Sequence, residues 1–138
     1  GPRYNNPNKD ITGVGKEFII FNYDALEMYR SVYICEGALN ALTIGDRGIA
    51  TMGKVVSKYQ LNELIKAPCQ RYIILLDFDA QKYAIELALK LIQYKKVKLV
   101  LFDDNRDVND LGRKAVLKKV YETRYATYQG LIKLKNSL

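Results

Sequence analysis

Short apolar runs alternate with longer segments of helical spacing along most of the chain. Two runs, RYIILL at 71–76 and VKLVLF at 97–102, are apolar almost throughout, which is typical of strands buried on both faces of a sheet. The expected strands cover residues 17–22, 31–35, 48–52, 71–76 and 97–102. Their alternation with helices predicts an α/β fold, in which a central, mostly parallel sheet carries helices on both faces.

Helical spacing is clearest between residues 80 and 94, where one face carries a continuous apolar stripe. Ser57 is a typical N-cap for the helix expected at residues 57–66. The expected helices cover residues 23–30, 37–44, 57–66, 80–94, 108–123 and 124–135. Residues 3–16 combine Asn, Pro and Gly with little apolar periodicity, so we expect a loop there.

Composition limits the kinds of protein that this chain can be. Its 138 residues suit one domain, and a hydrophobic content of 49% excludes wholesale disorder. The chain has no histidine, which excludes Ser–His and Cys–His nucleophilic pairs and histidine-ligated zinc. We expect Cys35 and Cys69 to be reduced, with Cys35 in the core. No apolar run approaches the roughly 20 residues that span a bilayer, so no membrane contact is expected.

Positive charge is concentrated in the last part of the chain. The net charge is +7, and after Gly112 seven Lys or Arg residues stand against the single acid Glu122. Such a segment suits a nucleic-acid backbone, although a solvated helix face or an interface with another domain explains it equally well. Tyr121, Tyr125 and Tyr128 lie in the same segment, where they either stack on bases or pack between helices.

Acidic residues follow three of the expected strands. Glu36 comes directly after residues 31–35, and Asp77 and Asp79 come after residues 71–76. The strand at 97–102 is followed by Asp103, Asp104, Asp107 and Asp110. In a parallel sheet these positions meet at the carboxyl edge, where ligands collect.

Carboxylates crowded at one edge repel one another unless a cation neutralises them. Oxygen ligands without His or Cys select a hard ion, Mg²⁺ or Mn²⁺, and such ions usually handle phosphates. The pattern therefore predicts a metal and phosphate site. A single acid at a strand end can equally cap a helix, and Asp103 and Asp104 can equally be solvated loop acids.

The same residues resemble a known family. Glu36-Gly37 after one strand and Asp77-x-Asp79 after a later strand resemble the Toprim domain, over about residues 31–111. Several further segments resemble the DnaG-type primases of bacteria and phages. These are residues 3–6 (RYNN), 15–22, 48–53 (GIATMG) with Ser57 and Gln60, 77–80, and 106–111 (RDVNDL). The chain departs from the family pattern at Asn40, where an Asp is usual, at Gln81, where a Gly is usual, and at Val14, where a Lys is usual.

The resemblance implies a function and a set of site residues. The implied activity is nucleotidyl transfer from NTPs, in which short RNA primers are made on a single-stranded DNA template. The implied catalytic residues are Glu36, Asp77 and Asp79, which would also bind Mg²⁺ or Mn²⁺, with Asp107 and Asp110 as further ligands. The implied contacts to NTP or nucleic acid are Arg3, Lys16, Lys54, Lys58, Arg113 and Lys114. The implied supporting residues are Gly37, Asn40, Gly53 and Asn109, and either Asn109 or Asp110 could fill the second acidic position of RDVNDL.

The resemblance also divides the chain into three parts. Residues 1–30 form an N-terminal lead, in which Gly1-Pro2 is typical of a tag-removal scar and the rest resembles the end of a primase N-terminal subdomain. Residues 31–111 form the Toprim catalytic domain, and residues 112–138 form a basic helical segment. The chain then resembles a piece of a longer primase, with little activity alone.

A replicative helicase is an expected partner, through regions outside this chain. The expected location is the cytoplasm, at the nucleoid or replication fork, or the host cytoplasm for a phage protein. Two alternatives stay open: a metal-dependent Toprim nuclease, and an inactive, RecR-like scaffold that binds nucleic acid. A topoisomerase is the least supported alternative.

Overall fold

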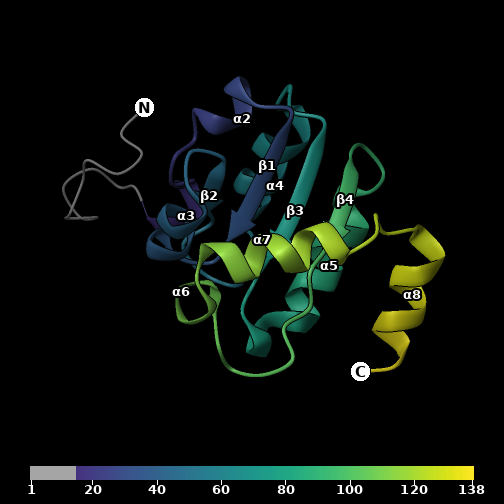
Figure 1. The fold of residues 1–138 in the computed structure, drawn as a ribbon. Helices are drawn as coiled ribbons and strands as arrows, with labels where there is room; N and C mark the ends of the chain where they lie inside the picture. Colours follow the sequence, from purple (N-terminus) through teal and green to yellow (C-terminus); the bar gives the residue numbers. More distant parts are fainter. Residues whose placement is uncertain (1–14) are drawn as a thin grey trace.

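A four-stranded parallel sheet forms the centre of the protein (Figure 1). The computed structural model describes residues 15–138, so the expectations for residues 1–14, including Arg3, lie outside the described residues. The strands are β1 (Ser31–Cys35), β2 (Gly48–Ala50), β3 (Arg71–Leu75) and β4 (Lys96–Leu99). They lie in the order β2-β1-β3-β4, and all three pairings are parallel. The expected α/β class with a parallel sheet is confirmed.

Helices cover both faces of this sheet. One face carries α3 (Ala38–Ile44), α6 (Val108–Leu111) and α7 (Arg113–Glu122), and α7 crosses the front of the sheet in Figure 1. The other face carries α4 (Lys58–Lys66), α5 (Gln81–Leu91) and α8 (Tyr128–Asn136). Successive residues of β3 alternate between the two cores: Tyr72 and Ile74 belong to the core under α4 and α5, and Ile73 and Leu75 to the other.

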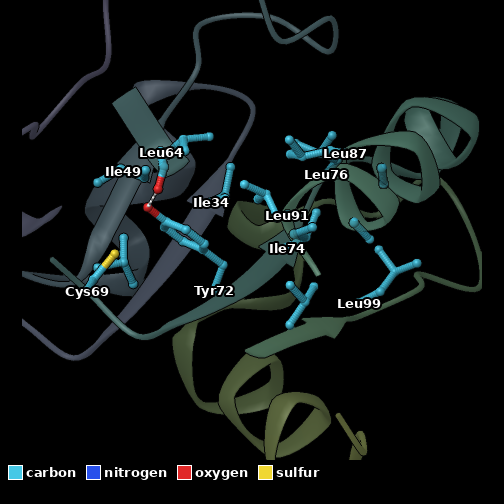
Figure 2. Close-up of a cluster of buried hydrophobic side chains, with 14 of the residues drawn as sticks. Ile34, Ile49, Leu64, Cys69, Tyr72, Ile74, Leu76, Leu87, Leu91 and Leu99 are labelled. Atoms are coloured by element: carbon cyan, nitrogen blue, oxygen red, sulfur yellow. Dashed lines mark hydrogen bonds between the residues drawn. The ribbon is translucent and has the colours of Figure 1, made fainter. Parts of the chain in front are cut away.

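The larger core lies between the sheet and α4, α5 and α8 (Figure 2). Tyr72 is fully buried there, and its hydroxyl donates a hydrogen bond of 2.6 Å to the carbonyl of Leu64, so the ring joins β3 to α4. Cys35 and Cys69 are both free cysteines, and Cys35 lies in the core, as expected; Cys69 is buried as well. Burial, together with the charge of Asp77, raises the pKa of the Cys35 thiol to about 12, which makes it an inert core group.

The prediction of a strand at residues 17–22 is wrong. That segment begins with a 3-10 turn, η1 (Lys16–Phe18), and only Phe21 pairs with the sheet, as a single antiparallel bridge to Ala50. The reason is the buried side chain of Gln60, whose Nε2 donates to the carbonyls of Ile19 (2.7 Å) and Lys16 (3.3 Å). These carbonyls accept hydrogen bonds from a side chain and not from a neighbouring strand. A short helix, α2 (Ala25–Met28), then leads into β1.

The single helix expected at residues 108–123 is also wrong. It is divided into α6 and α7 at Gly112, whose φ of +85° ends α6 while its N–H still bonds the carbonyl of Val108. The last helix begins at Tyr128 rather than 124, because the N–H of Ala126 donates to the carbonyl of Val97 and so runs this segment beside β4. Within residues 15–138, every helix is too short or too polar to cross a membrane.

Candidate metal centre

Three carboxylates converge at the carboxyl edge of the sheet. Glu36 follows β1, and Asp77 and Asp79 follow β3, in and beside the 3-10 turn η2 (Phe78–Ala80) that precedes α5. Strands β1 and β3 are direct neighbours, and Cys35 pairs with Leu75, so both chains leave the sheet at the same level. One oxygen from each of the three carboxylates lies within 4.8 Å of the others. We call Glu36, Asp77 and Asp79 the central acids.

Two oxygens of the central acids are buried without a partner. Oε1 of Glu36 and Oδ1 of Asp77 accept no hydrogen bond from any described residue. A buried polar atom left unpaired costs free energy, and native structures rarely keep one without a reason. Their convergence with Asp79 explains the unpaired state, because a cation placed between the three would give both oxygens a ligand role. The donor set is oxygen only, which fits Mg²⁺ or Mn²⁺.

Electrostatics support the same interpretation. Burial raises the pKa of Glu36, the charges of Asp77 and Asp79 raise it further, and Lys54 and Lys16 partly offset this. Burial also raises the pKa of Asp77, and repulsion from Asp107, Asp79 and Asp110 adds to the effect. Both shifts mean that negative charge at this place is unfavourable in the folded protein, and a divalent cation would remove that cost.

The fourth and fifth acids predicted as ligands are engaged elsewhere. Asp107 is the N-cap of α6, where its Oδ1 accepts from the N–H of Asp110 (2.8 Å). The carboxylate of Asp110 accepts in return from the N–H of Asp107 (3.0 Å). This reciprocal capping box fixes both side chains. Neither belongs to the three-carboxylate group, yet both lie near enough to raise the pKa of Asp77.

The remaining acids of this edge lie on the surface. Asp104 forms an ion pair with Arg106 at 3.0 Å, and Asp103 lies 3.4 Å from Nζ of Lys119. Both acids are exposed, which agrees with the interpretation as solvated loop acids.

Open space surrounds the two glycines of the site. Gly37 is the N-cap of α3 with an extended backbone (φ −114°), and a Cβ added to it or to Gly53 would meet nothing within 4 Å. The N–H of Gly53 donates to the carbonyl of Glu36 (3.2 Å), which holds the loop after β2 against the central acids. Packing therefore does not require glycine at Gly37 or Gly53, and the space beside them is available to a ligand.

The two amides have different surroundings. Asn40 is buried on α3 and adds no charge beside the central acids. Asn109 accepts a short hydrogen bond from the hydroxyl of Thr43, which ties α6 to α3. Sequence reasoning missed Thr43, because only the folded chain brings these two positions together.

The predicted basic contacts fall into two places. Nζ of Lys54 lies 3.9 Å from Oδ2 of Asp79, and Lys16 and Lys54 both line an open hollow of about 390 Å³ beside the loop of Gly53. Lys58 is exposed at the first position of α4. The other place is α7. There Lys114 is exposed, and Nε of Arg113 donates to the carbonyl of Ile44 (2.9 Å), at the end of α3.

Two further residues shape the site, and neither was among the predicted site residues. Gln60 donates to the carbonyls of Ile19 and Thr51, both at 2.7 Å, and so joins the N-terminal lead to the loop after β2. The ring of Tyr83 lies 6.0 Å from Nζ of Lys54. The sequence does contain a signal for Tyr83. It lies four residues after Asp79 at the start of a helix, and this spacing places the two side chains on one helix face.

Comparison with solved structures identifies the fold as that of primase catalytic cores. The chain is similar to the E. coli primase catalytic core, with a TM-score of 0.68 and 18% identity over 96% of this chain and 46% of that chain. It is also similar to the DnaG primase catalytic domain bound to ssDNA (TM-score 0.68, 17% identity, 91% of this chain, 44% of that one). A third neighbour contains the zinc-binding and RNA polymerase domains of the Aquifex aeolicus primase (TM-score 0.65, 19% identity, 82% of this chain, 32% of that one).

The chain thus spans less than half the length of these primase structures. No protein-family model matches the sequence, and no curated protein does. The expected primase-type fold is confirmed by all three neighbours.

Proposed function

We propose that this chain is the metal-binding catalytic part of a DnaG-type primase. In this proposal the complete protein makes short RNA primers at the replication fork, from NTPs on a single-stranded DNA template. The observation that carries it is the pair of buried, unpartnered oxygens of Glu36 and Asp77, which meet Asp79 at the carboxyl edge of the sheet. The primase-core fold around that edge supports the same assignment.

The reaction is the attack of a ribose 3′-hydroxyl on the α-phosphate of an NTP, with release of pyrophosphate. Glu36, Asp77 and Asp79 would hold the divalent cation. Bound there, Mg²⁺ or Mn²⁺ supplies positive charge for the phosphate oxygens of the transition state. Lys54 and Lys16 line the hollow beside the central acids, where their ammonium groups would pair with the phosphates of the nucleotide. Within this chain, which has no histidine, a carboxylate or a water would accept the hydroxyl proton.

Asp107 and Asp110 have a supporting part in this proposal. Their capping box starts α6 beside the central acids, and their charge attracts a cation without direct ligation. Asn109 and Thr43 hold α6 against α3, so the acids stay in place. The template DNA and a replicative helicase would be partners of the complete protein.

Primer synthesis by the full-length protein tests this proposal. We expect Asp79→Ala to lower primer yield on single-stranded DNA by about 100-fold or more, because one cation ligand is lost. Asp104→Ala is the matched control, since Asp104 is also an exposed aspartate of this edge but pairs with Arg106. Normal primer yield from Asp79→Ala would refute the proposal. Cleavage of a labelled strand without NTPs would identify a nuclease instead.

A further inference from the structure

A second hollow lies between α4 and α5, beside the candidate metal centre. It has a volume of about 110 Å³. Val55, Val56, Leu61 and Leu87 line it together with the ring of Tyr83. Drug-sized ligands occupy sites of roughly 300–1,000 Å³, so this hollow suits one flat ring system rather than an extended chain.

Lys54 connects this hollow to the central acids. Its Nζ lies 3.9 Å from Oδ2 of Asp79 and 6.0 Å from the centre of the Tyr83 ring. These two distances place the Tyr83 ring at most about 10 Å from that carboxylate oxygen. Val55 lines both this hollow and the open one that holds Lys16, so the two lie next to each other at the loop after β2.

Polar groups lie at the edge of the apolar walls. Glu86 and Lys90 also line the hollow, and within residues 15–138 neither side chain has a hydrogen bond or ion pair. They offer one acceptor and one donor group to the edge of a ring held between Tyr83 and the aliphatic side chains. A nucleobase presents this combination of a flat apolar face and a polar edge.

We propose that this hollow binds the base of the nucleotide whose phosphates lie at the central acids. The inference rests on the proposed function and adds the place of the base to it. Tyr83 supplies the stacking surface, and stacking tolerates any base because every base has a π-face. Lys54 lies between the two ends of the nucleotide, over the ring of Tyr83 and beside Asp79. One ribose is then the spacer between a phosphate at the acids and a base at Tyr83.

Two ligands and three variants of the 138-residue chain test the assignment. ATP and tripolyphosphate, each with Mn²⁺, differ by the nucleoside alone. We expect Tyr83→Ala to weaken ATP binding by about 5- to 150-fold, the range for loss of one stacked base, and to leave tripolyphosphate binding unchanged. Tyr83→Phe keeps the ring and should bind ATP as the parent chain does. Tyr94→Ala, at an exposed tyrosine beyond the end of α5, is the matched control and should change neither.

Methyl NMR gives a readout that does not depend on the metal. ATP should shift the methyl signals of Val56, Leu61 and Leu87, which line this hollow but not the one that holds Lys16, and tripolyphosphate should not. Equal ATP affinity of the parent chain and Tyr83→Ala, equal weakening of both ligands, or no methyl shift at saturating ATP would each overturn the base site. If ATP shifts these methyls but Mn²⁺ binds nowhere, the base site stands and the metal-centre proposal fails. A partner protein in this hollow would shift the methyls while ATP does not, which also overturns the inference.

Discussion

Two groups of acids share the carboxyl edge of the sheet, and they differ in what their oxygens do. The central acids, Glu36, Asp77 and Asp79, keep two buried oxygens without partners. The second group, which we call the loop acids, follows β4 and consists of Asp103, Asp104, Asp107 and Asp110. Every loop acid has a partner: a basic side chain for Asp103 and Asp104, and a backbone N–H for Asp107 and Asp110.

The loop acids stabilise the fold through their partners, whereas the central acids have unpaired oxygens that could bind a ligand. The loop acids form hydrogen bonds and ion pairs that hold one loop and the start of α6. At the central acids, burial and neighbouring carboxylates instead raise the pKa of Glu36 and of Asp77, so negative charge there carries a cost in the fold. A chain keeps such a cost most readily where function requires it. The comparison therefore favours the central acids as the proposed cation site, and four measurements test that proposal.

The largest expected effect is the loss of metal-dependent stabilisation. A cation at 100 times its Kd stabilises a folded protein by about 2.7 kcal/mol. We expect Mn²⁺ to raise the unfolding temperature of the parent chain and of Asp104→Asn, but not that of Asp77→Asn, which lacks one ligand charge. Thermal unfolding with and without Mn²⁺ measures this. If Asp104→Asn lost the Mn²⁺-dependent stabilisation as fully as Asp77→Asn, the two groups of acids would act alike.

A smaller effect is expected at the helix cap. Asp107→Ala removes the side chain that accepts from the N–H of Asp110, and loss of a cap typically costs about 1 kcal/mol of unfolding free energy. Asp107→Ser keeps a capping oxygen without the charge and should restore most of that stability. Urea unfolding measures both variants. If Asp107→Ser is stable but loses the Mn²⁺-dependent stabilisation as fully as Asp77→Asn does, Asp107 is a metal ligand, as the sequence predicted, and the division between the two groups is wrong.

The third effect has the opposite sign, because Asp77→Asn should stabilise the metal-free chain. The pKa of Asp77 is raised in the fold, so the folded state holds its proton more tightly than the unfolded state. Stability of the metal-free chain therefore falls as pH rises from the unfolded value near 4 through the raised pKa, and the loss persists above it. The Asp77→Asn substitution removes this loss of stability because its side chain carries no charge.

We expect a gain of about 1 kcal/mol or less near pH 7, by comparison with other stabilising changes. Urea unfolding at about pH 7 and about pH 3.5 measures it, and the gain should shrink at the lower pH, where Asp77 is protonated in both states. A variant that is less stable than the parent at pH 7 would show that the charge of Asp77 is already compensated within the fold.

The sequence predicted those elements whose pattern is dominated by burial. β1, β3 and α4 lie where their apolar spacing and the Ser57 cap placed them. The two main errors occur where a single residue decides the backbone conformation. Gln60 binds the carbonyl of Ile19, which a strand at residues 17–22 would use, and also that of Lys16 just before it. Gly112 ends α6 in a left-handed conformation, which the apolar periodicity of 108–123 does not show. A closer interpretation of Asp107-x-x-Asp110 as a capping box and Gly112 as its end would have found the second break.

The site was predictable in position but not in detail. Acids after parallel strands must meet at one edge, so the convergence of Glu36 with Asp77 and Asp79 followed from topology. Which oxygens are paired depends on side-chain rotamers and loop geometry, and these depend on contacts between distant residues. The bond from Thr43 to Asn109 and the approach of Lys54 to Tyr83 are examples. The roles of Asp107 and Asp110 stay predictions for the same reason.

The smallest effect is expected at the ion pair of Asp104 and Arg106. Their side chains are 52% and 65% exposed, and water and salt screen such a pair strongly. The guanidinium of Arg106 lowers the pKa of Asp104, so the pair exists, but it orders only its own loop. We expect Asp104→Ala, Arg106→Ala and the double variant to unfold at the temperature of the parent chain, at low salt and at about 1 M salt alike. A clear coupling between the two changes in this cycle would show that the loop after β4 is held rigid, and the loop acids would then be as much a part of the site's architecture as the central acids.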